Sequence, residues 1–570
     1  MCFVAILLLT TFHAFGQRPK SINEEQVVEP LDSISIDQTN VEYHITQAMH
    51  FLVTENKVKA LDYFLKAHEL MPSNAAVNHA IANIYQQQGN YSKAAYYAKL
   101  AFESDPKNHF YAASLASIQT AQGNLRSAIE TFEAMYKNSE EAPDEYLLEL
   151  AALYLYEGKA KKALETYDRI EKRLGILEEV SVQKQKIYLQ ENDLEGALKE
   201  GDRLVKAYPY IGAYVVEQAQ MMLSNGKEEE AVSYLSEYLI ENPNQPKVHL
   251  KLAEIYQQEA ELAKAIPHFE KAFSSEEISL RDKLNNFVPL VQTIGDSSLL
   301  INLGNRLVKV HPNEANAFAA NGDMYFALNQ KDKALENYRK AIGYNASNMQ
   351  LWQNILNLEF EQNNYKQVAN YAEEALSYFP NQAVFYLYAG TAYFSLKDYK
   401  KAIRNWEQGA SITFGNDELK STFHAQLGDA YHAEKENKKA YSNYEQAIKY
   451  NPDNFFAINN YTYYLALEKL QLEKAESLAS RMVKNNPTNG TFIDTYGWVL
   501  FQREKYTEAV KQLEKASQLS PSPTILEHYG DALYKAGQLE KAIQQWRKAL
   551  EKGNGTDLLK KKIEEEKYYE

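Results

Sequence analysis

Apolar residues recur along this chain in pairs of short stripes, and each stripe has the three- and four-residue spacing of one face of an α-helix. A clear copy spans residues 421–454, where Gly428 and Tyr431 lie on the first stripe and Ala440 and Tyr444 lie on the second. Polar residues separate the two stripes and a proline follows the second, as expected where a helix ends. Each such segment predicts two amphipathic helices that bury their stripes against each other. One pair leaves apolar surface in water, so a neighbouring pair is needed to cover it.

The order of residues in this segment resembles the tetratricopeptide repeat, a helix-turn-helix unit of about 34 residues. That family places Leu-Gly or Leu-Ala before a tyrosine in the first helix, and an alanine, an aromatic residue, a second alanine and a proline afterwards. The matching positions here are Leu427, Gly428, Tyr431, Ala440, Tyr444, Ala447 and Pro452. The resemblance covers nearly the whole chain. It implies an all-α fold, a right-handed superhelical α-solenoid of about fifteen such units with a C-terminal capping helix.

The quality of the repeats varies along the chain and predicts its division. A first array is predicted over residues 41–273 and a second over residues 313–553. Between them, residues 274–312 carry Leu300 where the small alanine of the second helix belongs, so we expect a degenerate unit and a joint there, because a larger side chain separates the helices. Residues 554–570 predict the capping helix, and their lysines and glutamates are predicted to form a solvated face.

The beginning of the chain resembles a secretory signal peptide, which we assign to residues 1–16. Residues 3–9 are all apolar, and small residues precede a predicted cleavage site before Gln17. This apolar run is far shorter than the ~20 residues of a membrane-spanning helix, and no later run reaches that length. We therefore expect an exported protein of the periplasm or cell envelope without a membrane span. Residues 17–40 mix charges, serines and two prolines without a period, and predict a flexible linker.

Composition and motifs argue against several functions. The formal net charge of -15 disfavours nucleic acid as a partner, since binding phosphates needs clustered Lys and Arg. The one cysteine, Cys2, lies in the leader, so no thiol chemistry is expected of the mature chain. His424 and His432 stand two helical turns apart, which suits surface histidines better than a metal site. No phosphate loop, nucleophile elbow or zinc-binding helix is found. We predict no catalytic residues, no cofactor and no metal, and a protein that is not an enzyme.

The resemblance implies a concave groove lined by the first helix of each unit, which in that family holds a segment of a partner protein. Counting from the small residues, the groove positions near the C-terminus are Asp429, His432, Tyr464, Asp494, Trp498, Phe501, Glu527, Asp531 and Tyr534. Acidic and aromatic residues alternate there, so the expected partner is a protein with a basic or amphipathic segment. The alternative for the larger rings is that they only pack between units.

The leading hypothesis is a non-enzymatic scaffold of the bacterial cell envelope that binds a partner segment in its groove. Residues 491–500 resemble a variant seen in bacterial envelope repeat proteins and support this end of the array. Two alternatives stay open. The same rings could stack on sugars in a glycan-binding solenoid of a polysaccharide system, or the chain could be a cytoplasmic adaptor whose leader is spurious.

Overall fold

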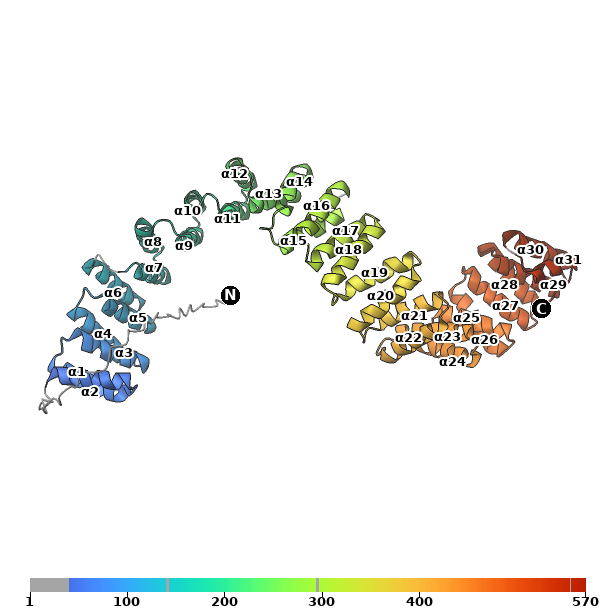
Figure 1. The fold of residues 1–570 in the computed structure, drawn as a ribbon, viewed down its shortest axis with the longest axis horizontal. Coiled ribbons are helices and arrows are strands. Elements are labelled where there is room, and N and C mark those ends of the chain that lie inside the picture. The colour runs from blue at the N-terminus through green and yellow to red at the C-terminus, as the bar shows by residue number, and fades with distance from the viewer. Residues whose placement is uncertain (1–39, 140–142, 294–296, 554) are drawn as a thin grey trace, which may run out of the picture. The chain divides into compact units, whose positions relative to one another are not determined.

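A computed structural model describes residues 40–139, 143–293, 297–553 and 555–570. Over these ranges the chain forms α-helices from α1 to α31 and no β-strand, which confirms the all-α fold (Figure 1). The predicted leader and all but the last residue of the predicted linker lie outside the described residues. No helix in the described part of the chain is long and apolar enough to cross a membrane.

The chain divides into two compact units, residues 1–231 and 232–570, and each is described by itself. The helices of the first unit are α1 (Val41–Val53), α2 (Lys57–Leu70), α3 (Ala75–Gln87), α4 (Tyr91–Ser104), α5 (His109–Ala121), α6 (Leu125–Asn138), α7 (Glu145–Tyr156), α8 (Ala160–Leu174), α9 (Glu178–Gln190), α10 (Leu194–Ala207) and α11 (Gly212–Ser224). The boundary between the units falls within α12 (Glu228–Glu241).

The second unit contains the remaining helices. They are α13 (Pro246–Gln258), α14 (Leu262–Phe273), α15 (Leu280–Thr293), α16 (Ser297–Val310), α17 (Ala315–Ala327), α18 (Lys331–Tyr344), α19 (Met349–Glu361), α20 (Tyr365–Tyr378), α21 (Ala383–Ser395), α22 (Tyr399–Ile412), α23 (Asp417–Ala433), α24 (Asn437–Tyr450), α25 (Phe455–Leu467), α26 (Leu472–Asn485), α27 (Gly490–Gln502), α28 (Tyr506–Leu519), α29 (Pro523–Lys535), α30 (Leu539–Lys552) and α31 (Asp557–Glu564).

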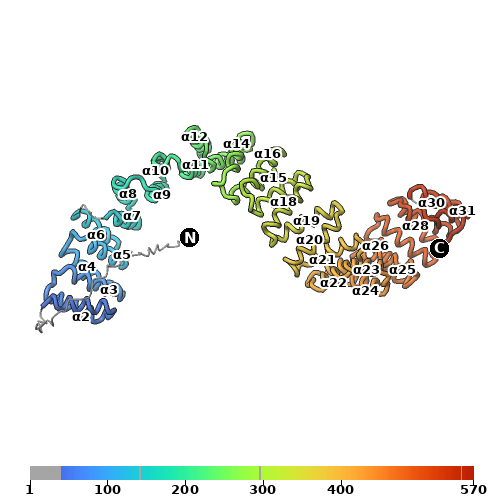
Figure 2. The backbone as a smooth tube through the Cα atoms, viewed as in Figure 1, coloured from blue at the N-terminus to red at the C-terminus, as the bar shows by residue number. Residues whose placement is uncertain are grey.

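Within each unit, consecutive helices pair into hairpins and each hairpin packs on the next, as the tube in Figure 2 lets the reader follow. The helix order matches the fifteen predicted two-helix segments followed by a closing helix, so the solenoid of hairpins is confirmed. The degenerate eighth hairpin is formed by α15 and α16, and its Leu300 is buried. The joint expected at residues 274–312 stays a prediction.

In the described turns inside the hairpins, a residue adopts left-handed backbone. Glycine adopts this conformation at little cost and supplies it in several hairpins, with φ of 73° at Gly89 and 79° at Gly537. A lysine supplies it at the equivalent position of α23–α24, where Lys435 has φ of 63°. The following backbone N–H, that of Glu436, donates to the carbonyl of Tyr431 over 2.8 Å and so satisfies a carbonyl at the helix end. In the described turns, a left-handed residue therefore marks the point where the first helix ends and the chain reverses into the second.

Small residues let the two helices of a hairpin approach, and a large ring fills the space beside them, as predicted. A Cβ built on Gly428 would lie 2.6 Å from the ring of Tyr444, and one on Gly530 would lie 2.4 Å from Trp546. Both rings and Ala440 are wholly buried. In the second unit these contacts join into one continuous core that reaches from α13 to α31.

Candidate binding surface

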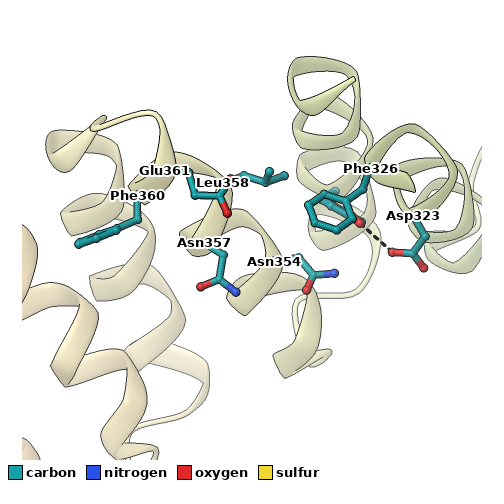
Figure 3. A pocket seen from close by; sticks show the side chains of 8 residues that line it. Asp323, Phe326, Asn354, Asn357, Leu358, Phe360 and Glu361 are labelled. Carbon is teal, nitrogen blue, oxygen red and sulfur yellow. Dashed lines mark hydrogen bonds between the residues drawn. The ribbon is translucent and has the colours of Figure 1, made fainter. Parts of the chain in front are cut away.

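A cavity of about 400 Å³ lies between the first helices of two neighbouring hairpins, α17 and α19 (Figure 3). Phe326 of α17 lines it although half of its surface, 51%, stays exposed to solvent. Asn354 extends from α19 toward Phe326 and Asp323 of α17, and Asn357 lies one turn further along α19. The Tyr338 hydroxyl donates a hydrogen bond of 2.7 Å to the Asp323 carboxylate and fixes that side of the cavity.

A second cavity of about 220 Å³ continues this surface toward the next hairpin. It is lined by Phe360 of α19 and by Val384, Leu387, Tyr388 and Thr391 of α21. Phe360 also lines the first cavity and, as Figure 3 shows, points away from Phe326, toward this hairpin. The two cavities thus adjoin through one phenyl ring. We call the face of α17, α19 and α21 that carries them the central face.

The repeat itself places these residues side by side. Phe326, Phe360 and Phe394 stand 34 residues apart, which is the length of one hairpin, so they occupy the same position near the end of successive first helices. The groove residues predicted from the sequence lie in the C-terminal hairpins and do not include this row. The recurrence of phenylalanine at the repeat length was a signal in the sequence that could have identified it. Phe326 and Phe360 line the cavities and contribute to their mainly apolar lining, whereas Phe394 packs against Tyr399 and Trp406 of its own hairpin.

Hydrogen-bonding groups on the central face are chiefly amides. Asn357 is exposed, and its Oδ1 accepts a hydrogen bond from the Tyr388 hydroxyl. The carboxylate of Glu361, at the rim, pairs with Lys331 over 2.7 Å. A guest on this face would therefore meet phenyl rings and amides, which can donate to and accept from a peptide backbone, and the Asp323 carboxylate, whose described partner is the neutral Tyr338 hydroxyl.

The groove residues predicted from the sequence fall into three groups in the structure. The first group, Asp429, His432 and Tyr464, is partly exposed on α23 and α25. His432 and Tyr464 stack with ring centroids 3.5 Å apart. Burial raises the pKa of the Asp429 carboxyl, although Tyr444 donates a hydrogen bond that opposes the shift.

The second group, Asp494, Trp498 and Phe501, lies buried along α27. Trp498 stacks on Phe501 at 4.7 Å and on His528 of α29 at 4.1 Å. His528 in turn contacts the Asp494 carboxylate at 3.0 Å. Burial lowers the pKa of His528, but the Asp494 carboxylate outweighs it and raises that pKa overall. These rings pack between hairpins, which was the alternative stated for them.

The third group, Glu527, Asp531 and Tyr534, lies on α29. Other residues of the same chain already contact this group. Lys562 of α31 places its ammonium 2.9 Å from Glu527 and 2.8 Å from Asp531. Lys562 is only 3% exposed, so the expectation that the lysines of this helix form a solvated face is wrong at this position. The reason is that Asp531 is itself buried and needs a cation. A role for the nine groove residues in partner binding stays a prediction.

The described residues hold no cluster of three or more His, Cys, Asp or Glu side chains suited to a metal ion. His424 instead contacts Asn443 at 2.9 Å and stacks on Tyr450. Its neighbour along the helix, His432, faces Tyr464 as described above.

Family models match several parts of the chain. Models described as tetratricopeptide repeat match residues 75–108, 246–278, 315–348 and 421–454, and a further one matches residues 354–416. A model described as anaphase-promoting complex, cyclosome, subunit 3 matches residues 468–549. The helices of the central face lie almost wholly within the tetratricopeptide matches.

A TPR repeat-containing protein of Pseudomonas aeruginosa is 30% identical over 80 residues, which cover 14% of this chain and 14% of that protein. Among solved structures, Naa15 in its Naa10 complex bound to HypK-THB is similar over 93% of this chain and 94% of its own, with 15% identity and a TM-score of 0.31. Yeast Tom70 is similar over 92% of this chain and 94% of its own, with 15% identity and a TM-score of 0.30. The Cut9–Hcn1 structure is similar over 92% of this chain and 96% of its own, with 14% identity and a TM-score of 0.28.

Proposed function

Because this chain is a tetratricopeptide-repeat protein, we propose that it is a non-enzymatic scaffold and that its central face binds a segment of a partner protein. The observation that carries the proposal is the pair of adjoining cavities that share Phe360 on the central face. A solenoid of hairpins offers extended surface, and on the central face that surface is hollowed by two cavities with a mainly apolar lining.

The lining of the cavities indicates what the segment carries. The larger cavity lies within the usual range of ligand pockets, ~300–1,000 Å³, and suits one or two large apolar side chains. The amides of Asn354 and Asn357 flank it and can pair with the N–H and C=O groups of an extended backbone. We therefore propose an extended, predominantly apolar segment.

Photo-crosslinking from the cavity tests this proposal. A photoreactive phenylalanine analogue at Phe326 in the native cells is expected to capture one defined protein through one defined segment. The matched control is the same analogue at Phe414, which is more exposed, 83% against 51%, but lies in the turn between α22 and α23, outside both cavities. Equal products from the two positions would contradict the proposal.

Glycan binding is the second candidate function, and the exposed Phe326 ring beside amide groups supports it, because sugars use the same two kinds of contact. The same experiment separates the candidates. A cross-link from position 326 to a polypeptide supports the scaffold, whereas a cross-link to polysaccharide supports the glycan-binding solenoid.

We also propose that the scaffold acts in the cell envelope, on the strength of the leader-like residues 1–16. The mature protein isolated from its native source is then expected to begin at Gln17, as N-terminal mass spectrometry will show. A native chain that keeps Met1 would favour the cytoplasmic adaptor instead.

A further inference from the structure

The residues that follow α31 fold back over the preceding hairpins. The Tyr568 ring meets Phe501 of α27 edge-on at 5.7 Å and lies 6.3 Å from the ring of Tyr534 of α29. Glu566, with φ of 52°, supplies the left-handed residue that reverses the chain after α31. We call residues 565–570 the returning segment. Two of the predicted groove residues, Phe501 and Tyr534, thus already face an aromatic side chain of the same chain.

Charged residues complete the surface on which this segment lies, and we call that surface the seat. Glu570 pairs with Lys469, in the turn between α25 and α26, and this contact holds the Glu570 pKa below its usual range. Lys535 lies over the Tyr568 ring at 4.8 Å, a cation–π distance. The seat therefore offers two aromatic rings for a third ring and lysines for a carboxylate.

The contacts that hold the returning segment in this seat are individually weak. Lys562 lies over the Tyr568 ring at 5.3 Å, and the Lys567 N–H donates to the Lys562 carbonyl over 3.1 Å. The ion pair of the segment is exposed on both sides, with 52% of the Lys469 side chain and 68% of the Glu570 side chain in water, and such pairs contribute little. Tyr568 is the residue of the segment that packs against the core, and it is only partly buried. By contrast, Lys562 within α31 is buried and bound to two carboxylates. The helix is thus fixed, whereas the segment beyond it can be displaced.

We propose that this seat, formed by Phe501, Tyr534, Lys535 and Lys469, is a second binding site, which takes an aromatic residue followed two positions later by a carboxylate. Tyr568 and Glu570 of the returning segment are its internal occupant and compete with a partner segment of the same chemistry. The site lies on other helices than the central face and does not depend on the function proposed there.

This assignment reverses the charge expected of the partner at this end of the array. The sequence favoured a basic or amphipathic segment because acidic residues, Glu527 and Asp531 among them, alternate with aromatic ones at the predicted groove positions. Lys562 already pairs with both of them inside the protein, so the exposed cations beside the returning segment, Lys469 and Lys535, select the guest.

In the test, one substitution in the full chain weakens the contacts of the returning segment, so that the seat becomes accessible to a probe. The probe is a fluorescent hexapeptide with the sequence of residues 565–570, and its binding is followed by fluorescence anisotropy. Tyr568→Ser is expected to bind the probe about ten-fold more tightly than the unchanged protein does. Tyr569→Ser is the matched control, because the contacts described for Tyr569 are with Lys561, Glu565 and Lys567 of its own stretch of chain. Circular dichroism melting shows whether both variants keep the fold.

A charge exchange checks the orientation of the guest. In the Tyr568→Ser protein, Lys469→Glu is expected to weaken the probe about five-fold, and a probe with lysine in place of its last glutamate is expected to recover the loss. Equal binding of the probe to Tyr568→Ser and to the unchanged protein would overturn the proposal. It would also be overturned if the unchanged protein sediments as a dimer that Tyr568→Ser dissolves, because the segment would then belong to a second copy.

Discussion

At the scale of single residues, two buried lysines show how partners decide the state of a charge. Lys184 is 1% exposed, and its ammonium lies 2.8 Å from Asp168 and 2.9 Å from both Glu171 and Glu200. Burial lowers its pKa, but the hydrogen bonds that its ammonium donates to the three carboxylates raise it overall. The cluster ties α8, α9 and α10 of the first unit together through charge in place of apolar contact.

Removing the Lys184 ammonium from this cluster is expected to lower the free energy of unfolding. Lys184→Met leaves the buried Glu171 and Glu200 with Arg203, 2.9 Å and 2.6 Å away, as their one remaining described cation, so the loss is expected to approach the ~3–5 kcal/mol of a buried pair broken from one side. Lys186→Met, on the exposed side of the same helix, is the matched control and is expected to change little. Chemical denaturation followed by circular dichroism compares them, and equal loss in the two variants would show that the cluster contributes no special stability.

Lys283, in the degenerate hairpin, has the opposite surroundings. It is wholly buried, donates to the carbonyl of Ser275 over 2.7 Å and meets His311 at 3.0 Å. No carboxylate is among the hydrogen-bond partners described for its ammonium, and burial lowers its pKa to about 8. Above that pH the folded protein holds this lysine neutral, while the unfolded chain stays protonated up to its ordinary value of 10.5.

Stability should therefore depend on pH through Lys283. Between about pH 8 and 10.5 the unfolded chain binds more protons than the folded one, so this residue's contribution makes stability rise with pH in that window. Lys283→Met is expected to melt at a higher temperature than the unchanged protein at pH 7, and the difference is expected to shrink by pH 10. Lys309→Met, exposed on α16, serves as control. A difference that stays constant from pH 7 to 10 would contradict this account.

At the scale of the element, the left-handed turn residue gives each hairpin its shape. Gly537 has φ of 79°, and a Cβ built on it meets nothing within 4 Å, so Gly537→Ala isolates the backbone cost of that conformation, ~1–2 kcal/mol. Gly343 also has free space around its Cβ position but lies inside α18 without a positive φ. Gly343→Ala is therefore expected to stabilise the protein by ~0.5–1 kcal/mol. Opposite shifts in melting temperature are predicted, and shifts of the same sign would contradict the turn assignment.

The packing inside a hairpin provides a second test at this scale. Ala440 is wholly buried between α23 and α24, so Ala440→Leu is expected to overpack the pair and cost ~1–3 kcal/mol. Lys438→Leu, in the exposed first turn of α24, should be nearly silent. Denaturation midpoints measure both effects, and similar values would mean that the register of the hairpins is wrong.

The helices and turns could be predicted from the sequence because their causes are local. The close approach of Gly428 to Tyr444 spans 16 positions, and the same spacing returns between Gly322 and Tyr338, Gly390 and Trp406, and Gly530 and Trp546. The contacts of Lys562 with Glu527 and Asp531 join residues 35 and 31 positions apart. They do not recur from repeat to repeat, so the periodic pattern of the sequence could not predict them. Burial of Trp498 and Phe501 likewise depends on neighbouring hairpins.

At the scale of the whole molecule, function is argued from surfaces that several hairpins share. The position of the groove-facing helices followed from the repeat, but the cavities of the central face depend on the spacing between α17, α19 and α21. That spacing is set by packing, which the one-dimensional pattern does not report. The row of phenylalanines at the repeat length was the part of this site that the sequence did contain.

The most direct test of the central claim is the affinity of the cross-linked partner segment for purified protein. Isothermal titration would compare the unchanged chain with Phe360→Ala, which alters the ring shared by both cavities, and with Phe414→Ala, which alters an exposed ring outside them. The account predicts that Phe360→Ala weakens binding about ten-fold or more, while Phe414→Ala leaves it unchanged. Equal affinity of the segment for all three proteins would contradict the claim that the central face is the binding surface.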